Sequence, residues 1–147
     1  MAKDRSYAKL GTSAVELAIA SQERMTEAEL LMREGRYASA IAMGIYSLEI
    51  LLKVKICRVL DLIALPTAFE IHNIDELLIL SGLSSALINE NNSILRSNWN
   101  EIKLVSIKEL NDLRYTPSLH WDKSKAEDFF LKLNHPQDGV FVWISNR

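Results

Sequence analysis

The chain has 147 residues, a length typical of one domain, and 48% of them are hydrophobic, which is enough for a core of its own. The net charge of −2 excludes a protein that grips duplex DNA through a strongly basic surface, although it leaves room for a small basic site. A single cysteine excludes an internal disulfide. The first residues are polar and lack the apolar core of a secretory signal, so we expect a cytoplasmic protein.

The first part of the chain predicts a long helical hairpin. We expect residues 1–12 to form a mobile lead-in, and we expect Ser13 to begin a helix because Ser13 and Glu16 match a capping box. Gly35 is typical of the left-handed residue that ends a helix. The stretch that follows, YASAIAMGIYSLEILLKVKICRVL, has no proline and is predicted to fold back against the first helix.

This second stretch predicts a buried central helix around which the rest of the chain packs. Its apolar side chains recur with the 3.6-residue period of a helix, at Ile41, Ile45, Leu48, Leu52, Ile56 and Val59. A second apolar row covers another side, as in a helix with neighbours on at least two sides. Glu49 and Lys53 interrupt the apolar run, which excludes a membrane span, and their spacing is typical of a helical ion pair.

Shorter helices are predicted in the second half of the chain. Asn73 and Gly82 mark the start and the end of one helix. The segment that begins at residue 84 or 85 is polar in its middle, which leaves open whether it forms one helix or two. Two further capping boxes begin at Ser106 and Ser124. We therefore expect residues 13–135 to form an all-α, up-and-down bundle of five to six helices.

The final residues, 136–147, have a different pattern. Asp138 and Gly139 form a turn signal, and the apolar run at residues 140–144 is typical of a strand. We expect a short extended C-terminal tail that packs against the bundle or pairs with a second copy, because an uncovered apolar edge promotes aggregation.

Few residues have the spacing of a known catalytic or metal site. No set of His, Cys, Asp and Glu residues matches a zinc site, and the chain has no phosphate-binding glycine loop, so we expect neither a metal nor a cofactor. His72 and His135 lie beside turn or cap residues and are predicted to have local roles. Cys57 is predicted to be a small core side chain.

The strongest candidate site is the segment LRYTPSLHW, which carries Arg114, Tyr115, His120 and Trp121. A guanidinium holds phosphate oxygens through two parallel bonds, and an imidazole carries a proton near neutral pH. Tyr115 and Trp121 are suited to stacking on bases. Two structural alternatives stay open: Arg114 as a charge at a helix C-terminus, and Trp121 as a core residue. If Arg114 lies above the Glu49 side of the central helix, Glu49 is placed to orient it.

The helical region from about residue 13 to residue 133 resembles the HEPN family (higher eukaryotes and prokaryotes nucleotide-binding domain). The strings that carry the resemblance are RYASAIAMGIYSLEILLKVKI, HNIDELL, LRYTP and SKAEDFFLKL. It implies a small helical homodimer, in many members a metal-independent endoribonuclease of a toxin–antitoxin or defence system. It also implies that Arg114 holds the scissile phosphate of RNA. His120 would act on the 2′-hydroxyl or the leaving oxygen, and two copies of the site would face each other across the dimer.

A second function, from a different class, fits the same resemblance. In the string LRYTP, arginine and tyrosine come shortly before a proline. This arrangement resembles that of HEPN members regarded as nucleotide-binding or as partners of minimal nucleotidyltransferases. The chain would then be a non-catalytic dimeric interaction module, with Arg114 paired to carboxylates and His120 turned away. The partners implied are RNA or a nucleotide, a second copy of the chain, and an antitoxin or nucleotidyltransferase, without a membrane.

Overall fold

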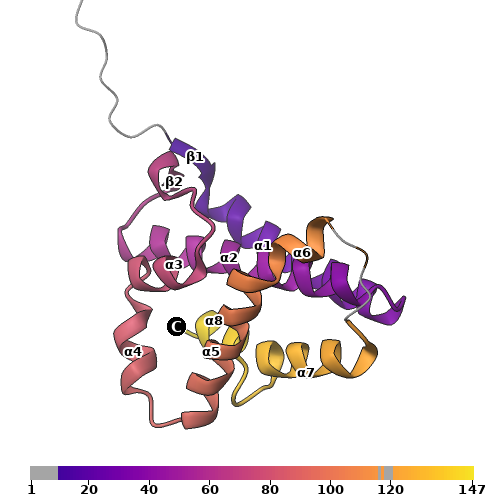
Figure 1. The fold of residues 1–147 in the computed structure, drawn as a ribbon. Helices are drawn as coiled ribbons and strands as arrows, with labels where there is room; N and C mark the ends of the chain where they lie inside the picture. Colours follow the sequence, from indigo (N-terminus) through magenta and orange to yellow (C-terminus); the bar gives the residue numbers. More distant parts are fainter. Residues whose placement is uncertain (1–9, 116, 118–120) are drawn as a thin grey trace, which may run out of the picture.

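The computed structural model describes residues 10–115, 117 and 121–147, which form an all-α bundle with one small sheet (Figure 1). The helices are α1 (Ala14–Arg33), α2 (Tyr37–Val59), α3 (Ile74–Leu80), α4 (Leu83–Asn89), α5 (Ser93–Lys108), α6 (Leu110–Tyr115), α7 (Lys123–Asn134) and α8 (Val140–Ser145). Strands β1 (Leu10–Ser13) and β2 (Ala64–Pro66) pair antiparallel, and the 3-10 turn η1 (Thr67–Phe69) follows β2. The all-α prediction is confirmed, although the described residues contain eight α-helices and not five to six.

The predicted hairpin is formed by α1 and α2, which lie side by side (Figure 1). Ser13 caps α1 with both bonds of the predicted capping box, and Gly35 takes a φ of +72° between the helices. Two buried serines join the helices: the Ser21 hydroxyl donates to the Ser47 carbonyl at 2.9 Å, and the Ser47 hydroxyl donates to the Ser21 carbonyl at 2.6 Å. Both hydroxyls are therefore satisfied inside the bundle.

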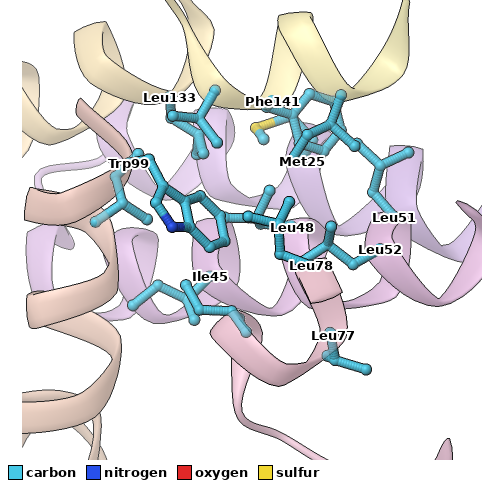
Figure 2. Close-up of a cluster of buried hydrophobic side chains, with 14 of the residues drawn as sticks. Met25, Ile45, Leu48, Leu51, Leu52, Leu77, Leu78, Trp99, Leu133 and Phe141 are labelled. Atoms are coloured by element: carbon cyan, nitrogen blue, oxygen red, sulfur yellow. The ribbon is translucent and has the colours of Figure 1, made fainter. Parts of the chain in front are cut away.

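The central position of α2 is also borne out. It contacts α1, α3, α6, α7, α8 and β2, and five members of the predicted row are fully buried: Ile41, Ile45, Leu48, Leu52 and Ile56. The prediction was wrong for Val59, the last residue of α2, which is 55% exposed. Figure 2 shows Leu48 and Leu52 among core side chains from α1, α3, α5, α7 and α8. Cys57 is buried, as expected of a small core residue. In the described part of the chain, no helix has the length and apolar character needed to cross a membrane.

Gly44 allows α7 to approach the first half of α2 closely. A β-carbon at this position would lie 3.2 Å from Phe130 and 3.3 Å from Leu133, tighter than ordinary side-chain contacts. The small residue at position 44 therefore lies where α7 packs on α2. Figure 1 shows α5 between α4 and α7.

The N-terminal prediction was wrong in part, because residues 10–12 are not a free lead-in. They belong to β1, in which Leu10 pairs with Pro66 and Ser13 with Ala64. The backbone N–H of Ala14 also donates to the Ile63 carbonyl at 2.9 Å. These bonds satisfy backbone groups that an isolated extended segment would leave to water. Residues 1–9 lie outside the described part of the chain.

The C-terminal prediction was wrong: residues 140–145 form the helix α8 and not an extended segment. A helix satisfies its backbone internally and needs no partner strand, and this one buries Val140, Phe141 and Ile144 in the core. The amine of Lys55 on α2 donates to the Ser145 carbonyl at 3.2 Å, which places a cation at the C-terminus of α8. Tertiary packing therefore overrides the strand preference of this apolar run.

Two predicted helix starts were also wrong. Ser106 lies buried within α5, because the apolar face of that helix continues past Ile102 and leaves no break for a cap. The cap of α7 is Asp122 and not Ser124, and its carboxylate accepts from the backbone N–H of Lys125 at 2.8 Å. The polar-centred segment that the sequence left open does divide into two helices, α4 and α5.

Candidate functional site

Arg114 and Tyr115 lie on α6, a short helix that packs on α2. Leu110 is buried and Leu113 is partly buried against the core, so the apolar residues of α6 hold it on the bundle. Arg114 and Tyr115 are exposed, and the Tyr115 side chain remains 81% accessible. The helix therefore presents a cation and an aromatic ring to solvent.

Tyr46 on α2 holds the Arg114 side chain. The Nε–H of Arg114 donates to the Tyr46 hydroxyl at 2.7 Å, and the central carbon of the guanidinium lies 5.3 Å from the centre of the Tyr46 ring. This hydrogen bond is the main cause that raises the pKa of Arg114, and the negative charge of Glu49 acts in the same direction. The bond uses only Nε, so Arg114 is a cation that Tyr46 positions.

Glu49 lies one turn from Tyr46 on the same helix and is paired with two other groups. Its side chain is only 7% exposed, and Oε1 lies 2.9 Å from the Lys53 amine and 2.7 Å from Nδ1 of His72. The predicted ion pair with Lys53 is therefore present. Glu49 was expected to orient Arg114, but Tyr46 makes that direct contact, and Glu49 acts on Arg114 through its charge.

His72 is the least expected member of this group. It lies just before the Asn73 cap of α3, and its side chain is 77% exposed although Nδ1 is bonded to the buried Glu49 carboxylate. An ionised carboxylate only accepts hydrogen bonds, so Nδ1 carries the proton, and in the neutral ring Nε2 keeps its lone pair. The sequence predicts only a local role for His72 and does not predict its bond to Glu49, which lies 23 positions away.

Tyr46, Glu49 and Lys53 form what we call the polar side of α2, and with Arg114 and His72 they form the candidate site. The sequence analysis missed Tyr46 and His72. For Tyr46 a signal was present, because residues 46, 49 and 53 have the spacing of one helix face. For His72 no local signal exists, since its partner is distant in the sequence.

Trp121 has a different environment from Arg114. It is half-buried and packs against the core, and it lines a pocket of about 320 Å³ between α5 and α7. The other residues that line this pocket are Glu101, Ile102, Leu104, Val105, Lys125, Asp128, Phe129 and Lys132. Trp121 therefore packs against the core, as one of the two alternatives for this residue predicts.

His120 lies outside the described residues, so the expected pairing of Arg114 with His120 stays a prediction. Within residues 10–115, 117 and 121–147, no group of three or more His, Cys, Asp and Glu residues is arranged to hold a metal ion. Within the same ranges, the partners of Glu49 are Lys53 and His72, and the hydrogen-bond partner of Arg114 is a hydroxyl and not a carboxylate.

Comparison of the chain with protein-family models, with curated proteins and with solved structures found no match. The function is therefore argued from the chemistry of the candidate site and from the resemblance carried by the sequence.

Proposed function

We propose that this chain is a HEPN-like cytoplasmic protein that binds RNA through the Arg114 site and cleaves it without a metal ion. The observation that supports this proposal is the position of Arg114: its Nε is fixed by Tyr46 while the side chain as a whole is exposed. A guanidinium fixed in this way loses little conformational entropy when it binds a phosphate oxygen pair.

Two further features support a nucleic-acid ligand. Tyr115 follows Arg114 and exposes its ring, so a base next to the bound phosphate has an aromatic surface on which to stack. The partner of Arg114 is a neutral hydroxyl, which leaves the positive charge uncompensated by direct ion pairing within the described part of the chain. An interaction module in which Arg114 is tied to carboxylates fits these contacts less well.

The chemistry that we propose is transesterification at phosphorus. The 2′-hydroxyl of RNA loses its proton, its oxygen bonds to phosphorus, the bond from phosphorus to the 5′-oxygen breaks, and that oxygen takes up a proton. The products are a 2′,3′-cyclic phosphate and a 5′-hydroxyl end. Arg114 stabilises the charge on the phosphoryl oxygens, and His120 is one of the two proton-transfer groups. We further propose that the protein is a homodimer in which two sites face each other.

The test is incubation of the chain with 5′-labelled single-stranded RNA in the presence of EDTA. We expect cleavage by the parent, with 2′,3′-cyclic phosphate ends detected by mass spectrometry, and loss of cleavage in Arg114→Ala and His120→Ala. Arg114→Lys keeps the charge but not the planar fork, so we expect it to bind RNA more weakly than the parent. Arg36→Ala, a change at an exposed arginine without a side-chain cap bond, is the matched control.

Different results would favour different functions. RNA binding that depends on Arg114 without any cleavage would favour the non-catalytic interaction module, and co-purification with a nucleotidyltransferase would then identify its partner. No binding of RNA by the parent under varied salt would contradict the proposal. Sedimentation velocity tests the homodimer separately.

A further inference from the structure

The pair formed by His72 and Glu49 has the arrangement of a proton-transfer group. The carboxylate is buried on the central helix and held by Lys53 at 2.9 Å, while the imidazole that it bonds through Nδ1 is exposed. A carboxylate in this position fixes the ring orientation and the tautomer, which leaves Nε2 with its lone pair. A histidine with only a local capping role does not require a bond to a buried carboxylate on α2, such as that of Glu49.

The position of this pair relative to Arg114 follows from α2. Arg114 is held by Tyr46 and His72 by Glu49, and residues three apart on a helix have β-carbons about 5–6 Å apart. The charge of Glu49 also contributes to the raised pKa of Arg114. The guanidinium and the imidazole are therefore both held by side chains of α2 that lie about one helical turn apart.

The proposed reaction also requires more than one proton-transfer group. One group takes the proton from the 2′-hydroxyl and another gives a proton to the leaving 5′-oxygen, and a single imidazole does not do both in the same step. Arg114 is charged at all relevant pH values and Lys53 is occupied by Glu49, so neither serves as the base.

We propose that His72 is the general base of RNA cleavage at the Arg114 site, with Glu49 as the residue that positions it. This inference rests on the proposed function. Nε2 of His72 takes the proton from the 2′-hydroxyl as the 2′-oxygen bonds to the phosphorus that Arg114 holds. The bond from phosphorus to the 5′-oxygen breaks, and that oxygen takes a proton from water.

His135 provides an internal control for the tautomer of His72. Its Nδ1 accepts from the backbone N–H groups of Gln137 at 3.2 Å and Asp138 at 3.1 Å, so its proton lies on Nε2. Long-range ¹H–¹⁵N spectra distinguish the two ring forms, and the chain has only three histidines to assign. We expect neutral His72 to carry its proton on Nδ1 and His135 to carry it on Nε2. The same form in both would overturn the inference.

The binding test uses an uncleavable probe, a dinucleotide with a 2′-O-methyl group. We expect the probe to shift the Nε2 resonance of His72 in the parent but not in Arg114→Ala, and to leave His135 unchanged. Binding that depends on Arg114 but does not affect His72 would overturn this inference and leave the proposed function intact. No binding at all would contradict both, so the two failures are distinguishable.

The kinetic test replaces His72 with asparagine. In His72→Asn the side-chain amide can still donate to Glu49 in place of Nδ1–H, but the nitrogen that accepts the proton is gone. We expect the cleavage rate to fall about 10²–10⁴-fold, the usual contribution of a general base, with little change in RNA affinity or melting temperature. His135→Asn, which keeps an acceptor for its backbone donors, is expected to cleave at the parent rate. Parent-like cleavage by His72→Asn would overturn the inference.

Discussion

The apolar side of α2, with Ile45, Leu48 and Leu52, packs in the core of the bundle. The polar side is also buried at Glu49 and Lys53, but these residues carry charge. Burial of the first side stabilises the fold through apolar area removed from water. Burial of two charges costs solvation that their attraction offsets only in part. We therefore expect the polar side to stabilise the fold less than the apolar side does.

The largest expected effect is on the apolar side. Leu48→Ala removes a fully buried side chain from the centre of the core, so we expect a loss of about 2–5 kcal/mol in the free energy of unfolding. Urea unfolding followed by circular dichroism measures it. RNA affinity per folded molecule should not change. A loss below about 1 kcal/mol would contradict close packing on this side.

A smaller effect is expected for the charge of Glu49. Glu49→Gln keeps the shape but weakens the bonds to Lys53 and His72, and we expect a loss of about 1.5–3 kcal/mol, the range for hydrogen bonds to charged groups. The double change Glu49→Leu with Lys53→Met removes both charges, and we expect it to be as stable as the parent or more so, yet inactive. If the double variant is much less stable than either single variant, the polar side serves stability after all.

Tyr46→Phe tests whether the Tyr46 hydroxyl positions Arg114 without contributing much to the free energy of unfolding. Loss of its hydroxyl removes the bond to Arg114, and since that bond lies at the surface we expect only about 0.5–1.5 kcal/mol of lost stability. RNA affinity should fall about tenfold, because a freed guanidinium must be ordered on binding. Fluorescence anisotropy with labelled RNA measures it. Tyr37→Phe, at the start of α2, is the control, and equal losses in the two variants would argue against an anchoring role.

The smallest expected effect concerns Cys57, which belongs to the apolar interior. Burial raises the pKa of its thiol, so the thiol stays protonated in the folded chain and reacts slowly with a maleimide. We expect labelling at neutral pH only after addition of denaturant. Because the thiol pKa is higher in the folded than in the unfolded state, stability should fall slightly as the pH rises above the ordinary thiol range. Rapid labelling of the folded chain would show that α2 is open at this end.

The sequence predicted the parts of the fold that depend on local signals. The period of residues 41, 45, 48, 52 and 56 located α2, and a hydroxyl followed by a carboxylate located the cap at Ser13. The same signals led to wrong predictions where a second cap residue lay nearby or where a buried helix face continued through the expected cap. Asp122 is as good a cap as Ser124 and lies two residues earlier, and the buried face of α5 continues through Ser106.

The candidate site was predictable only in part, because it is assembled from distant segments. Arg114 and Tyr115 were identified from residue chemistry, and Glu49 and Lys53 from their spacing. The bonds from Arg114 to Tyr46 and from His72 to Glu49 join residues 68 and 23 positions apart, and no local pattern encodes such pairs. The helical form of residues 140–145 likewise depends on the core that receives Phe141 and on Lys55.

The reciprocal serine bonds between α1 and α2 have a consequence for how accurately the two helices are aligned. Sliding one helix along the other by a single turn, about 5.4 Å, would break both bonds and strand two hydroxyls among hydrocarbon side chains. Ser47 directly follows Tyr46 and comes two residues before Glu49. The two serine side chains therefore fix the position of α2 along α1, and with it the position of Tyr46 and Glu49 along the bundle.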